Sequence, residues 1–293
     1  MYRLVTRRPQ IVQCNTFYPV PYFVVPCKFL RIPLIWHEHS FTTAYHPLAA
    51  KFFGHAVDHI ITVSNAVRKD LLAMGVKEDR VTTIYNSISR PAPEALNKQP
   101  PLTGIEEARQ AGFFCIGAAG PIEPRKGFLE LIEAVAHLER CALFIAGSVT
   151  QGDHAEYEQR LRRYVAEHDL SRRVIFLGRV HTMERFFNQI ELFVHYPTEP
   201  DPLPTVIIEA LANRCPVVAS DNGGNPECLG HGQWGTLVDP CEPRVLALKL
   251  AQLQEQPPGR LSTETQAQVL AGFSGARKEA LHMTVYNKLL VRG

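Results

Sequence analysis

Short runs of β-branched and aromatic residues alternate along this chain with longer segments of helical periodicity. The second half has six such runs, at residues 113–116, 142–146, 174–177, 192–195, 216–219 and 236–238. Between the first two of these, Phe128, Leu131 and Val135 recur at the spacing of one helical face. Short apolar strands that alternate with helices predict an α/β fold, in which helices cover both faces of a parallel sheet.

The first half repeats this pattern with shorter runs, at residues 10–13, 34–36, 59–63 and 81–85. Ser64 directly follows the third run, where it is suited to be the N-cap of a helix that begins at Asn65. Residues 89–104 separate the two halves and contain four prolines, a composition typical of a linker. The chain is therefore expected to form two lobes with Rossmann-like parallel sheets.

We place the first lobe at residues 1–103 and the second at residues 104–261. Helices are expected over residues 262–293, packing back on the first lobe. A doubly wound domain usually opens with a strand and a glycine-rich phosphate-binding turn, whereas the first glycine here is Gly54. The first lobe is therefore expected to be incomplete at its start.

Charge is distributed unevenly along the 293 residues, although the net charge is only +2. Residues 1–100 contain 12 basic and 6 acidic residues, and no acid precedes Glu38. A dedicated nucleic-acid binder would be more basic overall. The basic first half suits phosphates or an anionic membrane surface, and a solvated charged face explains it equally well. Residues 17–36 are long enough to span a membrane, but four prolines and two cations exclude a lipid-exposed helix.

The seven cysteines are scattered, odd in number and never spaced CxxC. This usage argues against a disulfide framework or a zinc ribbon and favours the reducing cytoplasm. His37 and His39 stand two residues apart, so on a strand both side chains point the same way. Their spacing from the other histidines fits no standard zinc pattern, and no metal is expected. Hydrogen-bonded core or loop histidines are the common alternative.

A proline-rich loop leads into a helix that starts near Thr205. The N–H groups around Thr205 and Val206 would be free, and the helix dipole favours an anion there. Asp201 and Glu209 flank this terminus and could accept hydrogen bonds from sugar or ribose hydroxyls. A purely structural explanation, in which Glu209 complements the dipole and Asp201 is a loop acid, is equally open.

A second polar segment runs from Gly120 to Gly127, between the 113–116 strand and the helix after it. It places Arg125 and Lys126 at the carboxyl edge of the predicted sheet, where open α/β sheets bind ligands. Two adjacent cations beside a glycine suit a diphosphate. Charged residues that are simply exposed to solvent in a loop would give the same sequence pattern. No Walker-type phosphate loop occurs in the sequence.

These segments, in this order, resemble the family 4 glycosyltransferases of the GT-B fold. The matching motifs are Arg125-Lys126-Gly127, Asp201-x7-Glu209 and Gly223-Gly224-Asn225-Pro226-Glu227. The resemblance extends over about residues 9 to 254. Two motifs depart from the family: the usual Gly-Arg pair reads Gly120-Pro121 here, and the first acid of the acidic pair is aspartate. The family's glycine-rich loop of the first lobe is absent from the sequence.

The resemblance implies roles for individual residues. Lys126 would pair with the donor diphosphate, with Arg125 in place of the missing arginine and Gly127 beside them. Asp201 would contact the donor sugar, and the family role of Glu209 is to hold the ribose hydroxyls.

Further roles implied by the resemblance concern the base, the diphosphate and the acceptor side. The backbone of Thr205 and Val206 would bind the diphosphate, and the loop with Arg179 and Val180 would pack against the base. His39 would lie near the sugar as a catalytic residue.

The resemblance implies a glycosyltransferase that moves a sugar from a nucleotide-sugar to a glycan or polyprenyl-linked acceptor. It would be retaining and independent of metal or other cofactors. A cytoplasmic location, with peripheral contact to an anionic membrane, is expected. Two alternatives stay open at this point: a nucleotide-sugar-binding remnant without turnover, and a nucleotide-sugar epimerase on the same fold. A non-enzymatic interaction protein would leave the Lys126, Asp201 and Glu209 set unexplained.

Overall fold

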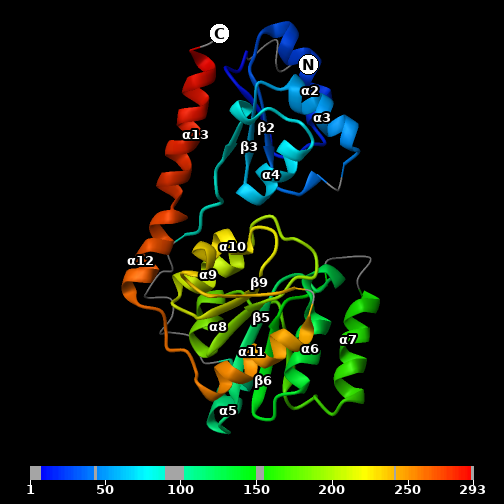
Figure 1. The fold of residues 1–293 in the computed structure, drawn as a ribbon, viewed down its shortest axis with the longest axis vertical. Coiled ribbons are helices and arrows are strands. Elements are labelled where there is room, and N and C mark those ends of the chain that lie inside the picture. The colour runs from blue at the N-terminus through cyan, green and yellow to red at the C-terminus, as the bar shows by residue number, and fades with distance from the viewer. Residues whose placement is uncertain (1–7, 43–44, 90–101, 150–154, 241, 292–293) are drawn as a thin grey trace. The chain divides into compact units, whose positions relative to one another are not determined.

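A computed structural model describes residues 8–42, 45–89, 102–149, 155–240 and 242–291. The chain forms two compact units. The first comprises the described residues up to Ser87, the segment Asp201–Leu203 and the described residues from Phe273 onward; the second comprises the rest. Of the two C-terminal helices, α12 (Thr263–Gly272) belongs to the second unit and α13 (Gly275–Leu290) to the first. Figure 1 shows both units as helices around a sheet.

The first unit contains a parallel sheet of four strands in the order β1-β2-β3-β4. The strands are β1 (Val12–Cys14), β2 (Leu34–Glu38), β3 (His59–Thr62) and β4 (Val81–Thr83). The helices between them are α2 (Val20–Leu30), α3 (Pro47–Ala56), α4 (Asn65–Ala73) and the short η2 (Glu78–Arg80). Each strand therefore lies next to the strand before it in the sequence.

Both faces of this sheet are covered, and β2 shows how. Leu34 and Trp36 point to one face and pack in the core that includes residues of α2, α3 and α4. Ile35 points to the opposite face, where it clusters with Val285 and Leu289 of α13. Successive strand residues face opposite ways, so the apolar run at 34–36 must be buried on both sides. Helix α13 supplies the second cover for the first unit.

The second unit contains six parallel strands in the order β10-β9-β8-β5-β6-β7. They are β5 (Phe114–Ala119), β6 (Cys141–Ala146), β7 (Val174–Gly178), β8 (Leu192–His195), β9 (Val217–Ser220) and β10 (Thr236–Val238). The helices besides α12 are α5 (Thr103–Gln110), α6 (Phe128–Ala136), α7 (Ala155–Glu167), α8 (Met183–Gln189), α9 (Thr205–Ala212), α10 (Asn225–Cys228) and α11 (Pro243–Glu255), with η4 (Pro124–Lys126) and η5 (Gly230–Gly232). The predicted α/β fold with two parallel sheets is confirmed.

Helices cover both faces of the second sheet as well. On one face, Ile116 and Leu143 join a core with Leu131 of α6 and Leu246 of α11. On the other face α8 lies directly on β5, because Gly117 has no side chain there. A Cβ at Gly117 would stand 2.4 Å from Cδ1 of Ile190 and 2.7 Å from the Phe186 ring. The sheet is thus enclosed, and its strand edges are where polar loops emerge.

All ten predicted strands are present, but several predicted ends are wrong by up to three residues. The run predicted at 10–13 forms a strand at Val12–Cys14, and the run at 113–116 continues to Ala119. The run at 34–36 continues through two polar residues to Glu38. Glu38 is fully buried because Trp36 Nε1 and the backbone N–H groups of His39 and Ser40 donate to its carboxylate. Apolar runs cannot locate strand ends where hydrogen bonds to neighbouring residues satisfy a buried polar side chain.

One smaller prediction is confirmed. Ser64 is the N-cap of α4, where its hydroxyl accepts from Val67 N–H at 3.2 Å. The six cysteines that the structure describes are all free and buried, and Cys241 lies outside the described residues. Within the described ranges, no helix combines the length and apolar character that a membrane crossing requires.

Candidate functional site

The direction in which successive strands are added to the second sheet reverses between β5 and β8. From β5 the chain proceeds to β6 and β7 on one side, whereas β8 leads to β9 and β10 on the other. In open parallel sheets, the carboxyl edge at such a switch point is the usual ligand site. The loops that leave β5 and β8 there are the two segments that the sequence singled out, with Arg125 and Lys126 in one and the approach to Thr205 in the other.

These two loops are joined through their backbones. The Thr198 N–H donates to the Arg125 carbonyl at 3.0 Å. Gly127 has φ 68°, and a Cβ on it would lie 1.8 Å from the carbonyl oxygen of Tyr196. A glycine is required at this point by both the left-handed backbone and the close approach. The cationic segment after β5 is therefore held against the loop after β8.

Neighbouring loops extend this junction along the carboxyl edge. Gly120 N–H donates to the Ala146 carbonyl at 3.1 Å, which ties the loop after β5 to the end of β6. On the other side, Ser220 Oγ and Asn222 Nδ2 donate to the Pro197 carbonyl at 3.3 and 3.2 Å. The result is a rim of interlocked backbone along β9, β8, β5 and β6, which we call the carboxyl rim.

Two cations occupy the short helix η4 on this rim. The Arg125 guanidinium is ion-paired with the Glu123 carboxylate at 2.6 Å, and the Arg125 side chain stays 41% exposed. Lys126 is the last residue of η4. Both cations therefore lie on the carboxyl rim, and Glu123 offsets part of the charge of Arg125.

Helix α9 begins at Thr205, as predicted, with Pro204 as its N-cap. Its first turn contains no acid, so the N–H groups of Thr205 and Val206 remain available to an anion. Glu209 lies one turn further along. Burial raises the pKa of its carboxyl, and the charge of Glu184 on α8 adds to the rise, while a hydrogen bond with the Thr205 side chain opposes it. In the protein without a ligand, ionisation of the Glu209 carboxyl is therefore less favourable than it would be in water.

The remaining donor-side candidates are spread more widely. Arg179 and Val180 follow β7, which lies beyond β6 on the same sheet, and the Gly178 carbonyl accepts from Gly147 N–H at 2.8 Å. Asp201 is 7% exposed and belongs to the segment Asp201–Leu203 of the first unit. The structure therefore joins Arg125, Lys126 and Gly127 to the loop before Thr205, while Asp201 belongs to the other unit.

His39 lies in the first unit, on a cavity of about 410 Å³ at the ends of β1 and β2. Polar side chains from these strand ends and from α13 line it: Gln13, Asn15, His37, His39, Lys278, Glu279, His282 and Tyr286. The rings of His37 and His39 are 4.2 Å apart, and the ring of His282 is 5.5 Å from that of His37. We call this set the histidine cluster.

Two histidines of the histidine cluster, His37 and His39, are held neutral. Burial lowers the pKa of His37 to about 3, with further lowering by His39, His282 and Lys278. Burial and Lys278 also lower the pKa of His39. Tyr286 donates to Gln13 Oε1 at 2.7 Å, and Gln13 Nε2 lies 3.4 Å from His37 Nδ1, which fits a proton on His37 Nε2. That Nε2 is buried and has no hydrogen-bond partner among the described residues.

Sequence reasoning missed Glu184 and the α13 residues Lys278 and His282. Glu184 comes from a different helix than Glu209, and no motif connects the two. Lys278 and His282 lie about 240 residues after His39. Their spacing of four residues places both on one helical face, which is the single local signal they carry. Within the described ranges, no three His, Cys, Asp or Glu side chains are grouped so as to hold a metal ion.

Comparison with known families identifies the chain. The model of the group 1 glycosyl transferases matches residues 106–269, and the model of glycosyltransferase family 4 matches residues 1–90. The first match alone covers more than half of the 293 residues. The chain therefore belongs to the group 1 glycosyltransferases.

Curated relatives include lipopolysaccharide core mannosyltransferase LpcC of Rhizobium leguminosarum bv. viciae, 28% identical over 194 residues. That match covers 64% of this chain and 54% of the relative. Alpha-maltose-1-phosphate synthase of Mycobacterium tuberculosis (strain ATCC 25618 / H37Rv) is 29% identical over 194 residues, 62% of this chain and 49% of the synthase. The chain thus matches about half the length of these relatives.

Solved structures share the fold over nearly the whole chain. Anabaena Alr3699/HepE in complex with UDP has a TM-score of 0.85 and 23% identity, covering 98% of this chain and 81% of that one. Sucrose-phosphate synthase of Thermosynechococcus elongatus has a TM-score of 0.81 and 19% identity, covering 100% and 76%. Because the sequence identities are this low, the similarity to these solved structures establishes only that the fold is shared.

Proposed function

We propose that this chain transfers a sugar from a nucleoside diphosphate sugar to a glycan or lipid-linked acceptor, with retention and without a metal. The observation that carries the proposal is the backbone junction at the carboxyl rim. It joins the Lys126 segment to the loop that enters α9, in a chain of the group 1 glycosyltransferases. A cationic side chain and a helix N-terminus on joined loops suit a diphosphate.

In the proposed reaction, negative charge develops on the diphosphate as the glycosidic bond to the donor breaks. Lys126 and the N–H groups of Thr205 and Val206 stabilise that charge without reorganising. Arg125, which is paired with Glu123, adds a second positive charge. Glu209 accepts hydrogen bonds from the ribose hydroxyls.

The other donor contacts in this proposal come from two loops. Arg179 and Val180, at the end of β7, pack against the base. Asp201 contacts the donor sugar.

The histidine cluster suits the acceptor. A neutral imidazole at His39 can accept a proton from an attacking hydroxyl, and the lowered pKa keeps it neutral at physiological pH. Lys278 adds a positive charge to the cavity and Glu279 a negative one, and both can bind hydroxyls of a glycan.

The names of similar proteins indicate which class of acceptor and which nucleotide to assay first. LpcC acts in lipopolysaccharide core biosynthesis, which supports a glycan acceptor, and HepE is in complex with UDP, which makes uridine the first base to test. The proposed location is cytoplasmic, with peripheral contact to an anionic membrane that carries the acceptor.

Calorimetric titration with UDP, GDP and ADP tests the donor half. Charge-assisted hydrogen bonds contribute about 1.5–3 kcal/mol, so Lys126→Ala and Glu209→Ala should each weaken binding by roughly 10- to 150-fold. Lys249→Ala on α11 is the matched control and should bind as the wild type does. Binding that both site variants retain would overturn the site assignment.

Turnover with the matching nucleotide-sugar then tests the reaction. Product that forms only with a glycan acceptor supports the transferase. Product that forms without an acceptor would identify an epimerase instead, and tight nucleotide binding with no turnover would identify a binding protein.

A further inference from the structure

The first unit exposes a group of large apolar side chains on two neighbouring helices. On α2, Tyr22 is 79% and Phe29 78% exposed, and Val25 is also exposed. Tyr18, two residues before α2, is exposed as well. On α3, which packs beside α2, Leu48 is 72% and Phe52 67% exposed. Single exposed apolar residues are ordinary on a protein surface, but five on adjoining helices, with Tyr18 just before them, form a patch that marks an interaction surface.

Helix α2 is apolar on two opposite faces. Val20, Val24 and Cys27 recur at helical spacing and are buried against the sheet. Tyr22, Val25 and Phe29 recur at the same spacing and are exposed. A helix of the surface of a soluble unit normally presents polar residues outward, so the second apolar face requires an apolar partner.

The charge around this patch is of one sign. Lys28 and Arg31 lie at the end of α2, and Lys51 lies on α3 between Leu48 and Phe52; all three are exposed. From residue 8 to residue 57, the single acid in the sequence is Glu38, which is fully buried. The patch and its surroundings therefore present cations and apolar side chains with no exposed carboxylate from this stretch.

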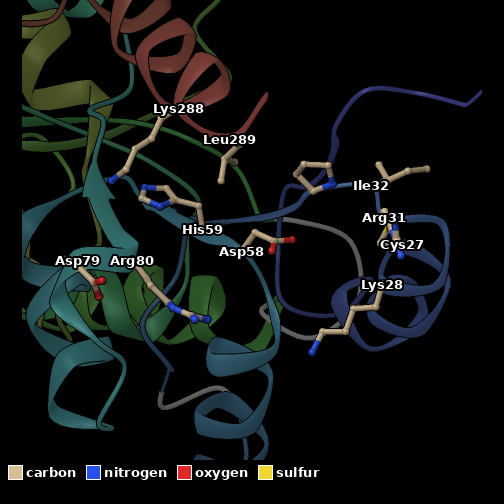
Figure 2. A pocket seen from close by; sticks show the side chains of 11 residues that line it. Cys27, Lys28, Arg31, Ile32, Asp58, His59, Asp79, Arg80, Lys288 and Leu289 are labelled. Atoms are coloured by element: carbon tan, nitrogen blue, oxygen red, sulfur yellow. The ribbon is translucent and has the colours of Figure 1, made fainter. Parts of the chain in front are cut away.

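A cationic cavity of about 420 Å³, whose lining side chains Figure 2 shows, lies beside Lys28 near the patch. Lys28 and Arg31 of α2 line it together with Arg80 and Lys288, against two acids, Asp58 and Asp79. Lys28 also lines the groove that Leu48 and Phe52 form on α3. Arg80 donates to the carbonyls of His55 and Val57 at the end of α3, at 2.9 and 3.2 Å. Apolar groove and cationic cavity are thus continuous through Lys28.

We propose that this α2–α3 surface docks on an anionic phospholipid bilayer. Tyr22, Phe29, Leu48 and Phe52 enter the boundary between headgroups and acyl chains, where aromatic and aliphatic side chains of interfacial helices reside. Lys28, Arg31 and Lys51 contact lipid phosphates, and one headgroup phosphate enters the cationic cavity. This inference deepens the peripheral membrane contact in the proposed function, and it explains how an acceptor in the membrane would be reached.

Vesicle co-flotation of the full chain tests the surface, with phosphatidylcholine vesicles made with and without phosphatidylglycerol. We expect binding to the anionic vesicles alone. A lysine near an anionic membrane contributes about fivefold in affinity, so Lys28→Ala with Lys51→Ala should weaken binding by roughly 25-fold. Phe29→Ser with Phe52→Ser should weaken it by about tenfold or more, because apolar contact is lost. High salt should not restore vesicle binding in either pair of variants.

Matched controls separate the surface from overall charge and hydrophobicity. Lys69→Ala with Lys77→Ala removes two exposed lysines elsewhere on the first unit, and Leu248→Ser removes a side chain that is 72% exposed on the second unit. Both should bind as the wild type does. Equal losses in these controls, or no binding of folded wild type to anionic vesicles at low salt, would overturn the proposal.

Two further readouts make the result specific. UDP titration of the same samples measures the donor site separately, so a failure of membrane docking and a failure of the proposed transferase are distinguished. Light scattering of the vesicle-free protein measures its mass. A dimer that the Phe29 and Phe52 variants dissociate, in a protein that does not bind vesicles, would assign this surface to a second copy instead.

Discussion

The two units build their candidate sites in opposite ways. In the second unit, the carboxyl rim is held by backbone, through the contact of Gly127 with the Tyr196 carbonyl and the bond from Thr198 to Arg125. In the first unit, the histidine cluster is held by side chains, through Gln13, His37, Lys278 and neighbours that the fold brings together from both ends of the sequence. A site that is held by close backbone contacts is disrupted when a glycine gains a Cβ. A site that is built from neutral histidine side chains is disrupted when one of them is protonated.

The largest effect is expected from Gly127→Ala. The new Cβ would collide with the Tyr196 carbonyl in a left-handed backbone, and strain plus displacement should cost about 3 kcal/mol of unfolding free energy. Gly178→Ala is the matched control, because Gly178 also has positive φ (66°) but open space around its Cβ position. It should cost about 1 kcal/mol. Urea unfolding of both variants measures the difference, and equal costs would show that the close approach does not matter.

A pH titration of stability tests the histidine cluster. In the folded protein the pKa of His37 is about 3, below its ordinary 6.5, so the unfolded chain binds the proton more tightly between these values. Stability should therefore be full above pH 6.5 and fall as the pH drops below it, by about 2 kcal/mol at pH 5. His37→Gln should flatten this fall, and His168→Gln, an exposed control just after α7, should not. An unchanged slope in His37→Gln would show that His37 is not the group that is held neutral.

A smaller effect is expected at the start of α4. Ser64 is fully buried and its hydroxyl is the acceptor for Val67 N–H, so Ser64→Ala should cost about 1 kcal/mol. Ser274 caps α13 in the same way, through Arg277 N–H at 3.2 Å, but at a more exposed position. Ser274→Ala should cost less, because water replaces the lost acceptor. Thermal unfolding of the two variants ranks them, and the reverse order would show that solvent exposure does not set the cost of these caps.

The smallest effect on stability is expected from Glu209→Gln. The pKa of Glu209 is raised by burial and by Glu184, so its ionisation opposes folding as the pH rises through that pKa. Removing the charge should leave stability at neutral pH unchanged or raise it by about 0.5 kcal/mol. Nucleotide binding should weaken at the same time. A variant that loses stability and keeps nucleotide affinity would show that Glu209 serves the fold rather than the ligand.

Much of the second unit could be predicted from local sequence. Its strands are apolar at nearly every position, and the start of α9 at Thr205 follows from the prolines before it. The Arg125-Lys126-Gly127 segment could be placed at a sheet edge for the same reason, since a loop after a parallel strand has one edge to occupy. Which side chains then pair there could not be predicted. The Glu123 partner of Arg125 and the Glu184 neighbour of Glu209 depend on how loops and helices pack.

The sequence by itself determined the alternation of strands and helices, the two parallel sheets, the cap at Ser64 and the family. These follow from local periodicity and from residues close together in the chain. The tertiary structure alone decided that Glu38 is buried inside a strand, that α13 covers Ile35 and completes the histidine cluster, and that α2 keeps an apolar face exposed. Burial is a property of what packs against a residue, and for these residues the packing partners lie up to about 250 residues away, or, on α2, are absent from the described residues of its own unit.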